Sequence, residues 1–146
     1  MRLQLALNVP DIDSAVDHYS KMFGVKAHKK NEGYANFAID EPPLKLILFE
    51  NPKAEAHLHH IGVEVLKAGG VQLAQERLDA AGILDQVQME TKCCHARQEK
   101  IWSRAHNGLR WEWYRIMDDT TTSGEDALGK TCCTGHQKSN NIGEVN

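Results

Sequence analysis

One order of predicted elements occurs twice along this 146-residue chain. The first unit is a strand, a helix and two strands, at residues 3–9, 11–24, 33–39 and 44–50. The second unit repeats that order, with a polar segment after its helix, at residues 59–65, 71–82, 99–104 and 110–117. The opening strands are offset by 56 residues, from Gln4 to His60, and the helix-ending glycines by 58, from Gly24 to Gly82. Such regular offsets indicate a duplicated unit.

Hydrophobic spacing supports these assignments. Leucines at every second position of "LQLALNV" predict a strand that is covered on one face. Asp11 is a preferred N-cap residue, and Gly24 supplies the left-handed end of the helix. Between them the apolar residues fall on one helical stripe, at Ile12, Ala15, Val16, Tyr19 and Phe23. We therefore expect an α+β fold built from two tandem modules.

Length and composition favour a single domain. With 41% hydrophobic residues, the chain can bury one core but not two independent ones. We expect one domain over residues 1–117, with modules at about 1–55 and 56–117. From residue 118 the composition changes to Asp, Thr, Ser, Gly, Lys and Asn with scattered apolar residues. Residues 118–146 are therefore predicted to form a flexible tail.

The same composition narrows the location and the partners. No apolar run approaches the roughly 18 residues that a membrane span needs, so no membrane partner is expected. "MRLQLALNVP" is interrupted too early, by Asn8 and Pro10, to serve as a secretory signal, which predicts a cytoplasmic protein. The net charge of -3 and a pI of about 6.2 argue against nucleic acid as a partner. A small molecule is the expected ligand.

Strand alternation places three polar side chains on one face of the sheet. Because successive residues of a strand point to opposite faces, Gln4, His60 and Glu112 all lie opposite the residues that pack on the helices. An amide, an imidazole and a carboxylate from three strands make a facial triad, the kind of ligand set that holds ferrous iron with open positions. Taken singly, each of the three is more often an ordinary polar strand residue, and their matching positions in a duplicated unit favour the triad.

Two pairs of adjacent cysteines are the second chemical signal, namely Cys93 with Cys94 and Cys132 with Cys133. A reducing cytosol disfavours structural disulfides, which leaves metal binding, catalysis or inert burial. Adjacent residues in a straight strand point to opposite faces, so two such thiols grip one atom only where the backbone turns. We therefore expect a loop over residues 91–96. For Cys132 and Cys133 the sequence leaves open a second capturing pair or a neutral feature of the tail.

Several of these stretches together resemble a known family. "LQLALNVPDIDSAVDHYSKMFG", "GYANFAIDEPPLKLILFE", "HHIGVEV", "TKCCHARQEKIW" and "WEWY" are similar to the vicinal oxygen chelate superfamily. Within it, "GYANFAI", "PPLKL" and the cysteines before "ARQEKIW" resemble the organoarsenical carbon-arsenic lyases, often called cadmium-induced proteins. The resemblance covers residues 2–116 and implies two βαβββ modules that form one concave mixed sheet.

The resemblance also implies an activity and a site. The activity would be an iron(II)- and dioxygen-dependent cleavage of the bond between carbon and trivalent arsenic. By this resemblance Gln4, His60 and Glu112 would bind the metal, and Cys93 and Cys94 would bind the arsenic. Soft thiolates suit soft arsenic better than oxygen or amide ligands do. The family has a tyrosine after its cysteine pair where this chain has a histidine, which alters the expected rim of the substrate pocket.

Other readings remain open from the sequence. His59 competes with His60 as the imidazole ligand, although alternation points it into the helix-packed layer. A thiol-based protein that sequesters arsenicals, cadmium or a drug would need the cysteines but no iron. A glyoxalase-type isomerase would need a fourth ligand from the run "LKLILFE", where Glu50 is the one carboxylate. The sequence decides neither between methyl and aryl arsenicals nor between modules paired within one chain and swapped in a homodimer.

Overall fold

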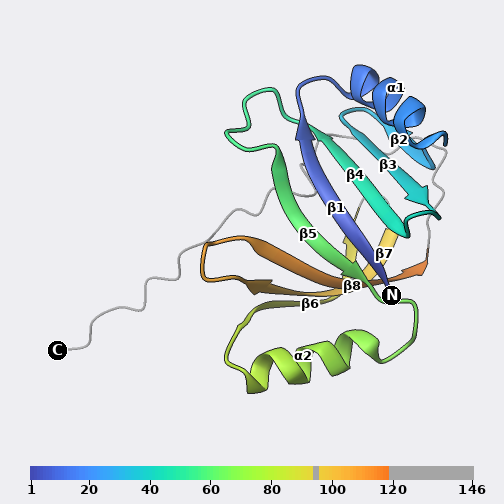
Figure 1. Ribbon diagram of the computed structural model, residues 1–146. Helices are drawn as coiled ribbons and strands as arrows, with labels where there is room; N and C mark the ends of the chain where they lie inside the picture. The colour runs from blue at the N-terminus through green and yellow to red at the C-terminus, as the bar shows by residue number, and fades with distance from the viewer. Residues whose placement is uncertain (94–95, 119–146) are drawn as a thin grey trace.

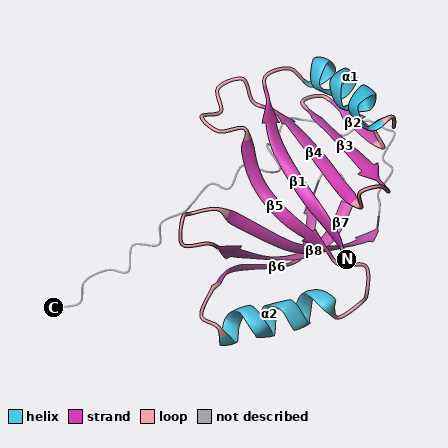
Figure 2. Ribbon diagram, viewed as in Figure 1, coloured by secondary structure: helices cyan, strands magenta, loops and turns pink. Residues whose placement is uncertain are grey.

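The computed structural model describes residues 1–93 and 96–118 and confirms the α+β fold (Figure 2). The first module comprises β1 (Arg2–Val9), α1 (Ile12–Phe23), β2 (Lys29–Asn31), β3 (Tyr34–Ile39) and β4 (Leu44–Glu50). The second comprises β5 (Leu58–Glu64), α2 (Gly70–Ala80), β6 (Leu84–Cys93), β7 (Ala96–Arg104) and β8 (Arg110–Asp118). Both modules therefore follow the order βαβββ.

The strands of the described residues form one curved sheet in the order β2-β3-β4-β1-β5-β8-β7-β6 (Figure 1). At its centre β1 and β5 run antiparallel, with Leu5 opposite Ile61. Each of these strands pairs in parallel with the last strand of its own module, β1 with β4 and β5 with β8. The two modules are thus related about the centre of the sheet, and they join within one chain.

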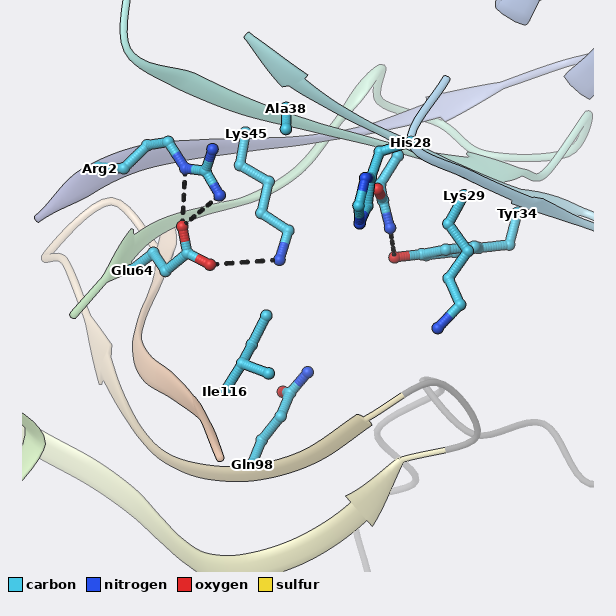
Figure 3. A pocket seen from close by; sticks show the side chains of 10 residues that line it. Arg2, His28, Lys29, Tyr34, Ala38, Lys45, Glu64, Gln98 and Ile116 are labelled. Carbon is cyan, nitrogen blue, oxygen red and sulfur yellow. Dashed lines mark hydrogen bonds and ion pairs between the residues drawn. The ribbon is translucent and has the colours of Figure 1, made fainter. Parts of the chain in front are cut away.

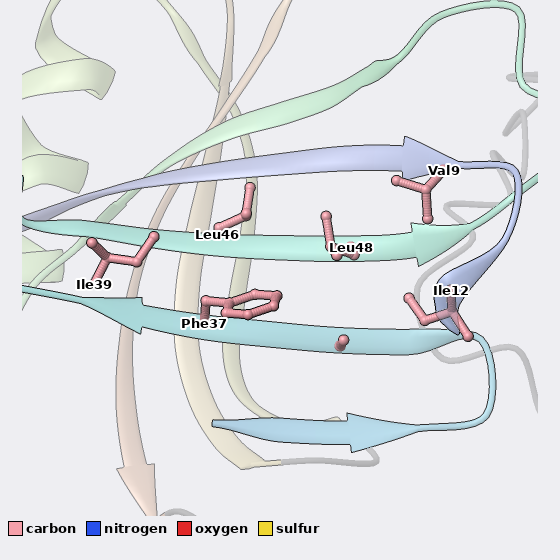
Figure 4. Close-up of a cluster of buried hydrophobic side chains, with 7 residues drawn as sticks. Val9, Ile12, Phe37, Ile39, Leu46 and Leu48 are labelled. Carbon is pink, nitrogen blue, oxygen red and sulfur yellow. The ribbon is translucent and has the colours of Figure 1, made fainter. Parts of the chain in front are cut away.

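Helix α1 packs on β3 and β4, and its termini match the sequence prediction. The Asp11 side chain accepts a hydrogen bond from the backbone N–H of Ser14 at 2.7 Å, and Gly24 ends the helix with φ of 67°. The predicted apolar stripe faces a cluster of buried side chains (Figure 4), which are Val9, Ile12, Ala35, Phe37, Ile39, Leu46 and Leu48. This core lies on the outer side of the sheet, and the buried polar residues Gln4, His60 and Glu112 lie on the inner side.

Helix α2 covers the other end of the sheet, against β6, β7 and β8. Its buried residues Val71, Ala74 and Leu78 pack with Val65 and Ile101 in a second, smaller core. Trp113 packs against this core, as alternation along β8 predicts. Glu112 consequently points away from it, to the inner side of the sheet.

Two strands were not assigned from the sequence, and both are edges of the sheet. β2 is a three-residue strand of Lys29, Lys30 and Asn31, and β6 occupies the polar segment that follows α2. Edge strands carry polar and charged residues that discourage pairing with other chains, so they lack the alternation that reveals a half-buried strand. The loop expected over residues 91–96 is wrong at both ends, because β6 extends to Cys93 and β7 begins at Ala96.

Residues 119–146, most of the predicted tail, lie outside the described residues, and Asp118 is the last residue of β8. The division into one domain and a tail therefore stays a prediction. In the part of the chain that the structure describes, no helix is both long and apolar enough to span a membrane.

Candidate metal centre

Gln4, His60 and Glu112 meet on the inner side of the sheet, as alternation predicts. Gln4 comes from β1, His60 from β5 and Glu112 from β8, and their exposed fractions are 1%, 5% and 5%. The Gln4 Nε2 atom lies 3.0 Å from His60 Nε2 and donates to Glu112 Oε2 at 2.9 Å. His60 Nε2 and Glu112 Oε2 are 3.2 Å apart. One atom of each side chain thus occupies a corner of a nearly equilateral triangle.

Gly62 makes this meeting sterically feasible. It pairs with Gln4 on one side and with Glu112 on the other, so it lies between them on the central strand β5. A Cβ atom added at Gly62 would lie 2.9 Å from Gln4 Nε2 and 3.1 Å from Gln4 Cβ. Because the glycine has no side chain, the Gln4 amide crosses β5 and reaches the carboxylate. A glycine inside a strand often marks such a close approach.

Lys100 holds the second oxygen of the Glu112 carboxylate. Its Nζ lies 3.2 Å from Glu112 Oε1, while Oε2 faces Gln4 and His60. Burial alone would raise the pKa of Glu112, but the hydrogen bond with His60 and the Lys100 charge outweigh it and lower the pKa to about 2. The carboxylate is therefore ionised at neutral pH despite its burial.

His59 lies beside His60 instead of in the helix-packed layer, which makes the alternation-based placement of His59 wrong. The β1–β5 register shifts here, with Ala6 opposite His60 but Leu7 opposite Leu58, so His59 has no partner in that ladder. Such a bulge interrupts the alternation of side chains and often re-aims one beside a site. Burial, followed by the charges of His60 and Arg110, lowers the pKa of His59 to about 4.

Aromatic rings fix the orientation of His60 from two directions. Trp102 lies edge-on to the His60 ring at 5.2 Å between centroids, and the Arg110 guanidinium stacks over Trp102 at 4.0 Å. The His59 ring also contacts His60, with 4.9 Å between ring centroids.

The sequence analysis did not identify Lys100. Ile101 is a core residue on the outer side of β7, so strand alternation places its neighbour Lys100 on the inner side.

The three corner atoms fit a divalent metal. Amide oxygen and nitrogen are assigned from hydrogen bonding, and turning the Gln4 amide over brings Oε1 to the corner now held by Nε2. The corners then present oxygen, nitrogen and oxygen, a facial set of an amide, an imidazole and a carboxylate. In an octahedral site with bonds of about 2.1 Å, adjacent ligands are about 3 Å apart, which agrees with the separations of 2.9 to 3.2 Å.

The amide is essential to this donor set. In the described part of the chain, His, Cys, Asp and Glu alone form no group of three or more that could hold a metal. Within the described residues, a metal at this position would therefore need the Gln4 amide as well as His60 and Glu112.

A cavity of about 200 Å³ also lies on the inner side of the sheet (Figure 3). Its walls are Arg2, His28, Lys29, Tyr34, Asn36, Ala38, Lys45, Glu64, Gln98 and Ile116. Lys45 is paired with Gln4, and Arg2 is two residues before Gln4 on β1, so two lining residues are strand neighbours of one triad member. Glu64 binds Arg2 at 2.7 Å and Lys45 at 3.5 Å, so charged groups line one wall.

The hairpin of β6 and β7 forms the opposite border of this cavity. Gln98 lines the cavity and pairs with Thr91 near the end of that hairpin. Cys93 is the last residue of β6 and pairs with Ala96. Cys94, Cys132 and Cys133 lie outside the described residues, so the arsenic-binding role of the first pair stays a prediction.

Glu50 is engaged elsewhere. Its Oε2 accepts a hydrogen bond from the Ile12 backbone N–H at 2.8 Å, at the start of α1. The first-module counterpart of Glu112 is Ile47, since Ile47 pairs with Ala6 as Glu112 pairs with Gly62. The first module therefore offers an apolar side chain at the position where a glyoxalase-type site would need a carboxylate.

A family model described as the Glyoxalase/Bleomycin resistance protein/Dioxygenase superfamily matches residues 3–113. The chain belongs to that superfamily. The matched range contains all three triad residues and nearly all of both modules. It confirms the superfamily that the sequence resembles.

Curated relatives extend over almost the whole chain. "Cadmium-induced protein CadI" of Mycobacterium tuberculosis (strain ATCC 25618 / H37Rv) is 42% identical over 142 residues, which cover 92% of this chain and 93% of that protein. The "Trivalent organoarsenical cleaving enzyme" of Thermomonospora curvata is 43% identical over 134 residues, covering 91% and 88%. These relatives confirm the branch of the superfamily that "GYANFAI", "PPLKL" and the cysteines before "ARQEKIW" resemble.

Solved structures share the fold at low sequence identity. A superfamily member from Vibrio splendidus 12B01 has a TM-score of 0.55 at 13% identity and covers 80% of this chain and 98% of that one. Methylmalonyl-CoA epimerase from Mycobacterium tuberculosis has a TM-score of 0.56 at 15% identity, covering 79% and 87%. At such identities the likeness establishes the fold alone.

Proposed function

We propose that this protein cleaves the carbon–arsenic bond of trivalent organoarsenicals, using iron(II) at Gln4, His60 and Glu112 and dioxygen as co-substrate. The observation that carries the proposal is the buried triangle of donor atoms on the inner side of the sheet, where a cavity also lies. The organoarsenical cleaving enzyme from Thermomonospora curvata, 43% identical, supplies the substrate class. When bound, the iron would activate dioxygen for oxidative attack on the carbon–arsenic bond.

The residues of this chain would hold the arsenical substrate and the metal in position. Cys93 and Cys94 would hold the arsenic as thiolates, because trivalent arsenic prefers sulfur. The cavity would receive the organic group, since its lining includes Lys45, the strand partner of Gln4, and Gln98 of the β6–β7 hairpin that carries Cys93. Lys100 would keep Glu112 bound through one oxygen by holding the other. A reducing cytoplasm, the location that we propose, would keep both thiols available.

The reaction balances with dioxygen as the sole oxidant. For methylarsenite, CH3As(OH)2 and one O2 give As(OH)3 and one formaldehyde. The carbon–arsenic bond breaks, one oxygen atom goes to arsenic and the other to carbon. Carbon is oxidised, dioxygen is reduced and arsenic remains trivalent, so no further reductant is required.

A glyoxalase-type isomerase would need Glu50 as a fourth metal ligand, and Glu50 is bound elsewhere in this fold. Glu50 would have to leave the N-terminus of α1 to reach the triad, and Ile47 occupies the matching inner position. Three protein ligands leave more open positions, which suits dioxygen chemistry better than a closed four-ligand site.

The deciding experiment compares turnover of methylarsenite with and without oxygen. Wild-type protein loaded with iron(II) is expected to release arsenite and formaldehyde only in the presence of oxygen. Cys93→Ser and Cys94→Ser are each expected to lose at least about 100-fold in turnover at limiting substrate, because misplacement near 1 Å costs that much. The double variant Cys132→Ser and Cys133→Ser is the matched thiol control and should retain full turnover.

Two results would count against this function. Iron-loaded wild type that binds methylarsenite without forming arsenite would indicate a sequestering protein. Activity on the hemithioacetal of methylglyoxal without oxygen would indicate an isomerase. Loss of turnover in the Cys132 and Cys133 double variant would instead make that second pair part of substrate capture.

A further inference from the structure

The bulge in β5 places two histidine rings in direct hydrogen-bond contact. His59 Nδ1 lies 2.7 Å from His60 Nδ1, which is a full hydrogen bond between neighbouring residues. The register shift opposite Leu7 makes this contact feasible, because it removes His59 from the regular alternation of the strand. The Phe49 ring packs against His59 at 5.0 Å and supports it from β4.

This contact couples the proton positions of the two rings. A hydrogen bond between two Nδ1 atoms carries one proton, so one ring donates it and the other accepts it. If His60 donates from Nδ1, its Nε2 keeps a lone pair that points at Gln4 and Glu112. If His59 donates instead, the neutral His60 ring carries its proton on Nε2, where it hydrogen-bonds Glu112 Oε2 at 3.2 Å. The first arrangement can bind a metal at Nε2, and the second cannot.

We propose that His59 is a positioning residue that accepts the Nδ1 proton of His60 and so presents the His60 Nε2 lone pair to the metal. The inference rests on the proposed function, because it requires a metal at the triad. Histidines that bind a metal through one ring nitrogen commonly donate the proton of the other to a partner, usually a carboxylate or a backbone carbonyl. Here a second histidine takes that place.

Trp102, the other aromatic ring that the described residues place against His60, cannot replace His59 in this role. Trp102 meets the ring edge-on and offers an indole N–H, which already points to Gln88 Oε1 at 3.4 Å. The indole of Trp102 has no lone pair that could accept the Nδ1 proton of His60, so it does not select the tautomer. Its edge-on packing affects only the orientation of the His60 ring. The tautomer therefore depends on the His59 contact.

Three variants test this role by metal affinity, measured with Co(II) under anaerobic conditions. His59→Phe keeps a ring against Phe49 and His60 but removes the acceptor, and we expect a 10- to 100-fold weaker Co(II) affinity. His59→Asn carries an oxygen at the position of Nδ1, and we expect affinity within about threefold of wild type because it still accepts the proton. His57→Phe, at an exposed histidine two residues away, controls for loss of an imidazole and should match wild type.

A second measurement reads the tautomers directly in the wild-type chain. With histidine labelled by nitrogen-15 and Zn(II) at the site, long-range proton–nitrogen NMR correlations are expected to show the proton of His60 on Nδ1 and that of His59 on Nε2. This measurement does not depend on turnover or on how well a variant folds.

The outcomes separate the two proposals. Wild type that binds neither Co(II) nor Zn(II) at the triad overturns the metal site, and this inference falls with it. If wild type binds Co(II) and His59→Phe binds equally well, the positioning role is wrong while the metal site stands. The same holds if NMR places the His59 proton on Nδ1 in the Zn(II)-bound protein. Weak binding by His59→Phe together with recovery in His59→Asn supports the role.

Discussion

The two modules share one backbone plan but differ at the positions that face the inner side of the sheet. Gln4 in the first module stands where the second has His60. Ile47, paired with Ala6, stands where the second has Glu112, paired with Gly62. The first module therefore gives one polar side chain of the triad and an apolar side chain, while the second gives two polar side chains of the triad. The strand pairings of the two modules match, whereas the side chains at the matching inner positions differ.

The modules also differ in how their helices and cores are built. Helix α1 has a side-chain cap at Asp11, and Glu50 accepts a second backbone N–H at its start. Helix α2 begins after Gly69 with no side-chain cap, and its buried cluster is the smaller of the two. Both modules bury polar side chains, among them Gln4 and Lys45 in the first and His60 and Glu112 in the second. The two copies thus differ in helix capping and in the size of their apolar cores, while both bury polar groups on the inner face.

The largest effect is expected from making the second module resemble the first. Glu112→Ile installs the residue type of Ile47, and it should weaken iron(II) affinity by more than about 100-fold and abolish arsenite release. It also leaves the Lys100 charge buried without its partner, which should lower the free energy of unfolding by about 3–5 kcal/mol. Metal titration and urea unfolding measure the two effects.

The double variant Glu112→Ile and Lys100→Met separates these effects. It removes the unpaired charge, so stability should recover while metal affinity stays low. Metal binding that returns in the double variant would contradict a ligand role for Glu112.

The next effect tests the glycine that distinguishes β5 from β1. Gly62→Ala would place a Cβ 2.9 Å from Gln4 Nε2, which forces the amide out of the triangle. We expect about 10- to 100-fold weaker metal affinity and turnover with the fold retained. Ala6→Gly, the reciprocal change at the first-module counterpart, should cost about 0.5–1 kcal/mol of stability and leave metal affinity unchanged. Wild-type metal affinity in Gly62→Ala would exclude Gln4 as a ligand.

The smallest effect is the pH dependence of the metal-free protein. Folding lowers the pKa of Glu112 from 4.5 to about 2, so the unfolded chain binds a proton at a higher pH than the folded chain does. The stability that Glu112 contributes is present above pH 4.5 and is lost as the pH falls toward 2. Ile47 has no titratable group, so the first module lacks this dependence. Urea midpoints should fall more steeply with acid in wild type than in Glu112→Gln, and equal slopes would contradict the shift.

The central strands could be predicted because one face of each packs on an apolar core while the other face carries polar residues. Leu5 and Ile61 alternate with polar residues, and this alternation placed Gln4, His60 and Glu112 on one face. The edge strands β2 and β6 have no such alternation, because edges need polar residues to avoid pairing with other chains. His59 was misplaced since alternation assumes a regular ladder, and the bulge breaks it.

The sequence by itself determined the duplicated order of elements, the faces of the central strands and the chemistry of the three triad residues. These follow from local rules, since hydrophobic period and strand alternation are set by neighbouring residues. Only the tertiary structure decided that Gly62 leaves room for Gln4, that Lys100 holds Glu112, and that His59 hydrogen-bonds His60. Those contacts depend on register between strands distant in the chain, and register arises when the whole sheet packs.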